Sequence, residues 1–410
     1  MQYLSSKLIH GSAAEGDPHR SLKTPIYESA SFDFASAEAA EQAFNGASEA
    51  FAYSRISNPT LAALQRQLKV LSQADHALCL ASGMAALSNV FLTLCSAGDN
   101  IITSRYLFGN TWSFFAKTLQ SYGIEARFTD LEDFNAVAEA MDENTRALFL
   151  EVPTNPQLIY FNVPALSALA GERNIPLVVD NTVLTPYLFP CKQYGVDIEV
   201  YSNTKFISGG ATSVGGSILV YPSHKWAHNP KLEKDYQLFG KDAFFKRLYK
   251  EHYRNLGACL APHNAWLQLL GLETLTLRVD RIMDNTLTVA EHLQNHPKVK
   301  GVRYPGLKED PYHPLALQLS GGKSGCLVGV ELENKAASYR FMNALQMVRR
   351  GTNFCDNKSM ILHPGATIYW DYSEEEKKAM HISEGLLRLS VGLEAVKDIL
   401  SDLDRALEQV

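Results

Sequence analysis

The segment Leu177-Val178-Val179-Asp180-Asn181-Thr182 is apolar for three residues and then becomes polar. The run Leu148-Phe149-Leu150, which lies upstream, is also continuously apolar. Uninterrupted apolar runs of this length are typical of parallel strands that are covered by helices on both faces. Both segments are therefore predicted to be buried strands of an α/β fold.

Short apolar segments alternate with helical stretches on both sides of these two runs. This alternation predicts βαβ units, and hence a mostly parallel sheet with helices on both faces. Strands are expected at residues 76–80, 100–103, 126–129, 147–152, 176–179, 198–202 and 217–220, and helices at 84–94, 112–120 and 163–172.

The chain is predicted to have three parts. Residues 1–60 are rich in Ser, Ala and Gly and weakly periodic, so they are expected to form an N-terminal arm. Residues 61–257 hold the α/β pattern and are expected to form the large domain. Residues 258–410 mix helices and strands, which predicts a smaller C-terminal α+β domain.

Composition narrows the classes of function. The 410 residues are 46% hydrophobic and 20% charged, with a net charge of -6, which is ordinary for a globular protein. Without a basic stripe, nucleic acid is not an expected partner. The chain shows neither a signal-peptide layout nor an apolar run of about 20 residues, so no membrane contact is expected. The six cysteines lack paired spacing, which favours reduced thiols in the cytoplasm.

Two predicted strands end in groups that suit an anion and a carbonyl compound. Ser82-Gly83-Met84 begins a helix, whose free N–H groups can hold an anion. Ser202 and Thr204 precede Lys205, and a lysine at a strand end can become an amine nucleophile. Taken alone, Ser82 is more typical of an ordinary helix cap, and a lone lysine is more typical of a solvated surface.

Two more predicted strands end in carboxylates. Asp180 can pair with a pyridinium N–H, although alone it is typical of a turn. Glu151 and Asn155 belong to the segment that follows the other strand. Because ligands bind beyond the carboxyl ends of strands in such sheets, we expect the four ends to supply one site. An anion cradle, a lysine that forms an imine and an acid for a ring nitrogen are what pyridoxal 5'-phosphate (PLP) requires.

Rival motifs do not fit their chemistry. Gly322-Lys323-Ser324 is similar to the end of a P-loop, but Leu317 stands where the first Gly is required. His224 and His228 can share a helix face, but no third ligand is close in sequence. No metal is therefore expected.

Beyond these residues, the chain resembles the Cys/Met-metabolism PLP-dependent enzymes, the cystathionine γ-synthase-like family. Apart from the four strand ends, the resemblance rests on Tyr53-Ser54-Arg55 and on the segment from Arg388 to Glu394. It covers nearly the whole chain. The resemblance implies a PLP-dependent transferase of fold type I (aspartate aminotransferase-like), with PLP bound to Lys205.

The resemblance also implies roles for individual side chains. Tyr53 and Arg55 would reach the cofactor phosphate of a neighbouring subunit, so a dimer with shared sites is expected, and a tetramer is implied. Phe108 stands where the family has a Tyr that stacks on the cofactor. The cofactor is expected to contact Ser82, Gly83, Met84, Phe108, Asp180, Ser202, Thr204 and Lys205, and the amino-acid substrate Glu151, Asn155, Asn353 and Arg388.

One branch of the family is the most similar. The segment from Asn353 to Ser359 resembles the Asn-x-Gly-Asp-x-Lys-Ser/Thr segment of O-acetylhomoserine sulfhydrylases, with Cys355 in place of Gly. That branch implies γ-replacement on O-acetyl-L-homoserine by sulfide or a thiol. The alternatives are a methionine or cystathionine γ-lyase and, in another class, a non-catalytic PLP-binding protein.

Three departures from the family pattern bear on the reaction. They are Phe108, Gly209-Gly210-Ala211 and Ile368-Tyr369. Phe108 cannot donate a proton, which a departing thiolate needs more than a departing carboxylate does, because carboxylates are much less basic. An O-acyl ester is therefore the favoured substrate, unless Tyr106 or Tyr369 supplies a hydroxyl.

A mixture of two inactive variants tests the shared site. Arg55→Ala and Lys205→Ala chains, unfolded together and refolded, are expected to regain part of the native activity, because some mixed dimers contain one site with both native residues. Activity is measured before and after mixing. Complete lack of recovery would contradict sharing.

Overall fold

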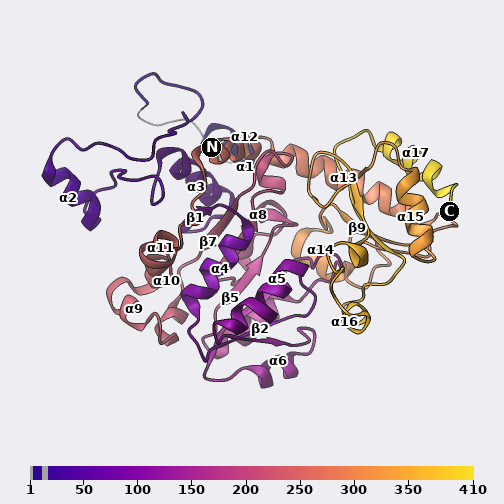
Figure 1. Cartoon of the computed structure of the whole chain (residues 1–410), viewed down its shortest axis with the longest axis horizontal. Helices are drawn as coiled ribbons and strands as arrows, with labels where there is room; N and C mark the ends of the chain where they lie inside the picture. Colours follow the sequence, from indigo (N-terminus) through magenta and orange to yellow (C-terminus); the bar gives the residue numbers. More distant parts are fainter. Residues whose placement is uncertain (1–2, 12–16) are drawn as a thin grey trace. The chain divides into compact units, whose positions relative to one another are not determined.

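The computed structural model describes residues 3–11 and 17–410. The chain forms two compact units, each built from two segments. Figure 1 labels its helices and strands. Unit 1 comprises Met1–Cys95 and Asp197–Thr274, and unit 2 comprises Ser96–Val196 and Leu275–Val410. Residues 1–2 and 12–16 of the predicted arm lie outside the described residues. The three-part division of the chain stays a prediction.

Unit 1 contains three adjacent strands in the order β1 (His76–Leu80), β7 (Gly216–Val220) and β6 (Ile198–Ser202). β7 runs antiparallel to both neighbours, with Val220 opposite His76 on one side and Ile198 on the other. All five residues of β7 are buried, in keeping with its central place. The chain therefore reverses direction at β7, directly after the segment that carries Lys205.

Helices of unit 1 begin where the sequence offers caps. Asn58 caps α3 (Pro59–Ser72), and Ser82 caps α4 (Gly83–Leu94), each by accepting a backbone N–H. The other helices are α1 (Leu4–His10), α2 (Ala37–Asn45), η3 (Phe206–Ser208), η4 (His224–His228), α9 (Glu233–Phe239), η5 (Gly240–Asp242), α10 (Ala243–Arg247), η6 (Leu248–Tyr253), α11 (Arg254–Leu256) and α12 (Pro262–Glu273).

Unit 2 contains a parallel group of strands. The order is β5 (Leu177–Asp180), β4 (Thr145–Glu151), β2 (Asn100–Thr103) and β3 (Glu125–Phe128), and each neighbouring pair is parallel. The apolar residues of β4 and β5 are buried, as their continuous runs predict. The α/β fold class is thereby confirmed. The helices nearby in sequence are α5 (Gly109–Ser113), η1 (Phe114–Leu119), α6 (Phe134–Ala140), α7 (Val163–Glu172), α8 (Thr185–Leu188) and η2 (Cys191–Tyr194).

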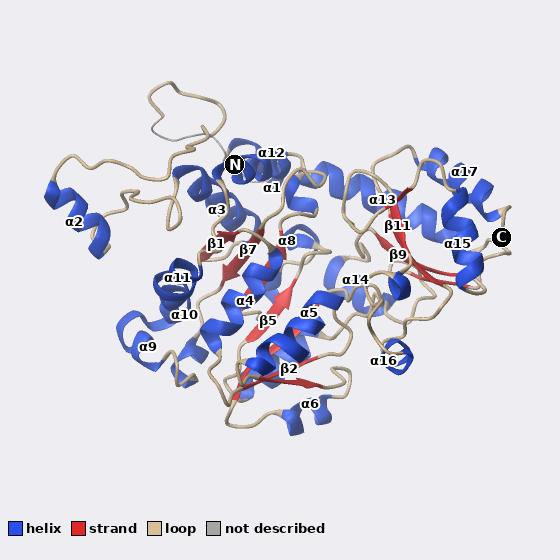
Figure 2. Cartoon of the chain, viewed as in Figure 1, coloured by secondary structure: helices blue, strands red, loops and turns tan. Residues whose placement is uncertain are grey.

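A second sheet lies in the C-terminal segment of unit 2. Its order is β10 (Arg349–Arg350), β11 (Met360–Leu362), β12 (Leu386–Ser390), β9 (Leu327–Glu331) and β8 (Gly301–Arg303). Figure 2 shows α15 (Lys335–Ala344) and α17 (Val396–Leu407) beside it. Apolar side chains of these helices, of the sheet and of α13 (Leu275–Gln294) form one core. The remaining helices are α14 (His313–Ser320), η7 (Pro364–Ala366) and α16 (Glu374–Ala379).

The predicted elements match the structure within a few residues, with one difference in type. The segment 112–120 was expected to form one α-helix, but α5 gives way to the π-helix η1 at Phe114. None of the helices among residues 3–11 and 17–410 is both long and apolar enough to span a bilayer. The same residues contain no cluster of three or more His, Cys, Asp or Glu that could bind a metal.

Gly216 allows β7 to pass the start of α4, which yields a test by substitution. A Cβ at Gly216 would lie 2.0 Å from the Ser82 carbonyl oxygen and 2.7 Å from the Gly83 nitrogen. Gly216→Ala is therefore expected to lower the free energy of unfolding by about 1–3 kcal/mol, as overpacking does. Urea denaturation measures this.

The matched control is Gly301→Ala in β8. A Cβ there would meet Glu331 at 3.7 Å, an ordinary contact, so its stability should stay close to native. Equal stability of the two variants would contradict the packing argument.

Candidate active site

The start of α4 and the end of β6 meet closely in unit 1. Ser82 accepts a hydrogen bond from the Ala85 nitrogen at 3.1 Å, and a Cβ at Gly83 would lie 3.0 Å from the Ser202 Cβ. The backbone at Gly83 thus passes close to Ser202 because no side chain intervenes. Ser202 therefore lies at the end of α4 that carries its first N–H groups, including that of Met84. This arrangement can hold a phosphate.

Lys205 lies in the turn that follows β6. Its nitrogen donates to the Ser202 carbonyl at 3.2 Å, and its side chain is half-buried. The neighbouring Thr204 hydroxyl accepts from the Gly215 nitrogen at 3.2 Å. Lys205 and two of the predicted phosphate ligands, Ser202 and Thr204, therefore lie in or beside one turn of unit 1.

Sequence reasoning missed the side chain that fixes this turn. Buried Asn203 donates to Gln268 on α12 and accepts from Ser217 on β7, each at 2.8 Å. An amide between Ser202 and Thr204 carries no distinguishing sequence signal. Beyond the turn, Gly209, Gly210 and Ala211 all have positive φ (81°, 116° and 57°), so the departure from the family pattern occupies a left-handed stretch.

Two carboxyl groups lie at the ends of adjacent strands in unit 2. Glu151 on β4 pairs in register with Asp180 on β5. Burial raises the pKa of Asp180 to about 6. Burial and the nearby charge of Asp180 raise the pKa of Glu151 well above its usual value. A cation placed beside these two carboxyl groups would favour their ionised form. The pair therefore suits a protonated ring nitrogen.

Arg388 on β12 is a buried cation with several carbonyl partners. Its Nη1 donates to the Asn155 side-chain oxygen at 3.2 Å, and its Nη2 donates to the Thr352 oxygen at 2.8 Å and the Asn353 oxygen at 3.4 Å. Its buried Nε has no hydrogen-bond partner among the described residues. Burial lowers the pKa of Arg388 to about 10. A carboxylate would supply both the missing acceptor and the missing charge.

The predicted substrate ligands Asn155 and Asn353 thus contact Arg388 directly, through a side chain and a backbone carbonyl respectively. The Asn353 side chain itself donates to Asp356 at 3.1 Å. The ring of Phe354 lies 5.1 Å from the Arg388 guanidinium carbon, a stacking distance for a cation. The structure brings this set together within unit 2.

Phe108 precedes α5, and its nitrogen donates to Glu151 at 2.9 Å. Tyr369 is buried, and its hydroxyl donates to the Leu107 oxygen at 2.9 Å, with the Asn155 oxygen at 3.3 Å. The Tyr372 hydroxyl donates to the Gly109 oxygen at 3.0 Å. The two tyrosines therefore fix the chain on both sides of Phe108, a role that sequence reasoning missed. A pocket of about 360 Å³ beside Phe108 is lined by Phe108, Gly109, Asn110, Ser113, Thr352, Thr367, Ile368, Trp370, Asp371 and Tyr372.

Tyr53 and Arg55 are exposed. The Arg55 guanidinium carbon lies 5.4 Å from the centre of the Tyr53 ring, and its Nη1 donates to the Arg254 carbonyl. Solvent-facing side chains of this kind are accessible to another molecule. Their contact with a neighbouring subunit stays a prediction.

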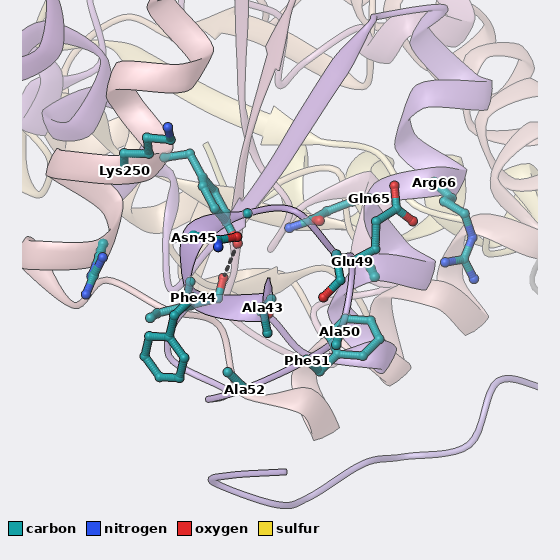
Figure 3. A pocket seen from close by; sticks show the side chains of 17 residues that line it. Ala43, Phe44, Asn45, Glu49, Ala50, Phe51, Ala52, Gln65, Arg66 and Lys250 are labelled. Atoms are coloured by element: carbon teal, nitrogen blue, oxygen red, sulfur yellow. Dashed lines mark hydrogen bonds between the residues drawn. The ribbon is translucent and has the colours of Figure 1, made fainter. Parts of the chain in front are cut away.

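A cavity of about 700 Å³ lies in unit 1. Part of its lining comes from residues 43–57 of the predicted arm, close in sequence to Tyr53 and Arg55. In Figure 3, Phe44 and Lys250 stand on one side and Arg66 on the other. None of the predicted site residues lines it. Its lining includes both charged and apolar side chains: Phe44, Glu49, Phe51, Arg66, Lys250 and Arg254.

Residues 5–408 match the sequence profile of the family described as Cys/Met metabolism PLP-dependent enzyme. The chain belongs to this family. The resemblance inferred from the strand-end motifs is thereby confirmed, and PLP is the cofactor.

Relatives within the Cys/Met metabolism family include two kinds of enzyme. An O-acetyl-L-homoserine sulfhydrylase of Leptospira meyeri is 34% identical over 423 residues, covering 98% of this chain and 96% of that protein. An L-methionine gamma-lyase of Pseudomonas putida is 34% identical over 406 residues, covering 98% and 97%. A solved structure from Campylobacter jejuni, named as an O-acetylhomoserine (thiol)-lyase, has a TM-score of 0.94 at 33% identity over 99% of both chains. That structure carries N'-pyridoxyl-lysine-5'-monophosphate at its position 205.

The residues of this chain fit PLP. Gly83 brings the start of α4 against Ser202, no cation among the described residues affects the pKa of Glu151 or Asp180, and no described residue accepts the Arg388 Nε–H. Each of these features matches one part of the cofactor or of an amino-acid substrate. The assignment of individual residues to PLP stays a prediction.

The raised pKa of Asp180 predicts a pH dependence of stability in the cofactor-free protein. Its carboxyl favours the folded state while protonated, and this contribution is lost as the pH rises from about 4, the reference value, through about 6. Over that range Asp180→Asn should lose about 2 kcal/mol less stability than the native chain does. Urea denaturation at several pH values measures the difference. Parallel pH profiles would contradict it.

Proposed function

We propose that this enzyme performs a γ-replacement on O-acetyl-L-homoserine, in which sulfide or a thiol displaces acetate and homocysteine or methionine is formed. It would thus act as an O-acetylhomoserine sulfhydrylase in methionine biosynthesis. The Leptospira and Campylobacter relatives support this, because both are named for O-acetylhomoserine chemistry. The segment from Asn353 to Ser359 supports the same branch.

PLP, when bound, spreads the negative charge that develops on substrate carbons. We propose that Lys205 holds the cofactor and then moves protons between substrate carbons. Lys205 lies in the turn that follows the carboxyl end of β6, where ligands bind in such sheets. The pyridoxyl-lysine at position 205 of the Campylobacter structure supports this assignment, because the two chains match over 99% of both lengths.

The remaining roles follow from the contacts within each unit. In unit 1, Ser82, the amides of Gly83 and Met84, Ser202 and Thr204 would bind the phosphate. In unit 2, Asp180 would keep the ring nitrogen protonated, and Phe108 would stack on the ring. Arg388, with Asn155 and Asn353 against it, would orient the substrate carboxylate, and Glu151 would position the segment at Phe108 through its hydrogen bond.

One observation carries the choice of leaving group. Phe108 has no hydroxyl, and the buried hydroxyl of Tyr369 already donates to a backbone carbonyl. The Tyr106 hydroxyl lies 3.5 Å from His381. Because Phe108 has no hydroxyl and those of Tyr369 and Tyr106 lie against Leu107 and His381, acetate, a weak base, can leave more easily than a thiolate.

A methionine or cystathionine γ-lyase is the second candidate, and the Pseudomonas putida relative favours it. The two candidate enzymes share the cofactor and the fold. The sulfhydrylase adds sulfur to its amino-acid substrate, whereas the lyase releases sulfur from its substrate. The relatives that are named are enzymes, which favours catalysis over the alternative of a non-catalytic PLP-binding protein.

The oligomer and the location belong to the same proposal. Exposed Tyr53 and Arg55 would complete the site of a second subunit, which makes a dimer the smallest active form, with a tetramer implied by the family resemblance. Reduced cysteines and sulfide chemistry suit the cytoplasm.

A comparison of two reactions tests the leaving-group argument. The native enzyme is expected to form homocysteine from O-acetylhomoserine and sulfide faster than it releases methanethiol from methionine. Phe108→Tyr should raise the relative rate of methanethiol release by about tenfold or more, because a general acid contributes at least that much. Both products are quantified by mass.

Phe134→Tyr is the matched control, since Phe134 is exposed and outside the predicted site. It should leave the ratio of the two rates unchanged. Dominant methanethiol release by the native enzyme would overturn the proposal in favour of the lyase.

A further inference from the structure

Two thiols lie in contact in unit 2. Cys326 directly precedes β9, and Cys355 lies in the loop between β10 and β11. Their Sγ atoms are 3.0 Å apart, and both side chains are buried. Both residues are present as thiols in the structure. They approach each other from segments that are far apart in sequence, so the fold itself brings them together.

Cys355 occupies a backbone position that favours glycine. Its φ is 52°, in the left-handed region, and it stands where the similar family segment has Gly. Its nitrogen donates to the Ser390 hydroxyl at 3.1 Å, and the same hydroxyl lies 3.5 Å from the Cys326 sulfur. Ser390 therefore contacts both residues and limits how far either can move.

The surroundings of Cys326 favour its reactive form. Burial raises the pKa of its thiol, but hydrogen bonds with Cys355 and Ser390 and the charge of Arg388 outweigh burial, so its pKa lies below the usual value. The thiolate is the nucleophile in cysteine oxidation. Cys79 in unit 1 is the opposite case, because burial raises its pKa to about 12.

The loop that carries Cys355 also holds Arg388. The oxygens of Thr352 and Asn353 accept hydrogen bonds from the Arg388 Nη2. Thr352 is exposed, so a local opening of this short loop would admit a small oxidant to the thiols. A bond between the two sulfurs would draw Cys355 toward Cys326 and displace the loop carbonyls from Arg388.

We propose that Cys326 and Cys355 form a reversible disulfide that weakens binding of the substrate carboxylate. A peroxide is the oxidant. The Cys326 thiolate attacks the peroxide oxygen and becomes a sulfenic acid, and hydroxide leaves and takes up a proton to form water. The Cys355 thiol then attacks the Cys326 sulfur, forms the S–S bond and releases a second water. Two electrons pass from the thiols to the peroxide, and a dithiol reductant restores both thiols. The effect on substrate binding rests on the proposed role of Arg388, whereas the disulfide itself does not.

The first measurement is covalent and needs no activity. The native PLP-loaded protein is treated with hydrogen peroxide, the remaining thiols are alkylated, and the protein is digested without reductant. A cross-linked peptide containing Cys326 and Cys355 is expected, and dithiothreitol should release it. If both residues are recovered as alkylated thiols, or only as sulfinic or sulfonic acids, the proposal is overturned.

The second measurement is kinetic. In the oxidised native enzyme the KM for the amino-acid substrate should rise about tenfold, the cost of one hydrogen bond to a charged group, while kcat changes less. Dithiothreitol should reverse the rise. A cross-link with an unchanged KM would refute the link to Arg388.

Variants locate the effect. Cys355→Gly, which places the family residue at the left-handed position, should neither cross-link nor change its KM after peroxide, and Cys326→Ser should behave alike. Cys79→Ser, the matched control for a buried thiol, should respond as the native enzyme does. A peroxide-dependent KM in Cys355→Gly would assign the effect to another residue and overturn the proposal. If the chain does not act on O-acetylhomoserine, the peptide cross-link still tests whether Cys326 and Cys355 form a disulfide.

Discussion

Charged groups held away from water are the constraint on which the chemistry of unit 2 depends. Moving an ion out of water costs several kcal/mol unless ion pairs or hydrogen bonds offset it. A buried ionisable group therefore indicates that a partner stabilises it in the working protein. Glu151 and Asp180 stand side by side with raised pKa values, and Arg388 is buried with one N–H that no described residue accepts. A cationic ring nitrogen and a substrate carboxylate would supply the missing partners.

The aromatic residues around Phe108 act together and not singly. Replacing a hydroxyl-bearing ring with Phe108 removes a possible acid, and Tyr369 does not replace it, because its hydroxyl holds the backbone at Leu107. Tyr372 holds Gly109 in the same way. The two departures from the family pattern at Phe108 and Tyr369 therefore belong to one arrangement, in which the hydroxyls of Tyr369 and Tyr372 hold the backbone on both sides of Phe108.

Most of the fold could be predicted because apolar periodicity is a local signal. The runs of β4 and β5, the Ser82 cap and the polar residues after each strand are all visible within a few residues. The π-helix at Phe114 was missed, since an i→i+5 pattern has no distinctive residue. The contacts of Asn203, Tyr369 and Cys326 were missed for another reason: each joins segments distant in sequence, and pairing at that range depends on packing, which a single sequence does not show.

The pocket beside Phe108 differs from the cradle at Gly83 in what forms its walls. At the cradle, a Cβ on Gly83 would lie 3.0 Å from the Ser202 Cβ and 3.1 Å from its Cα, so an added side chain would press on the end of β6. The pocket is lined by side chains such as Thr352, Ile368 and Trp370, the last of them largely exposed. Substitutions can therefore reshape this wall one residue at a time without changing the backbone at Gly83. Laboratory selection for bulkier sulfur nucleophiles would do best to begin at the same positions.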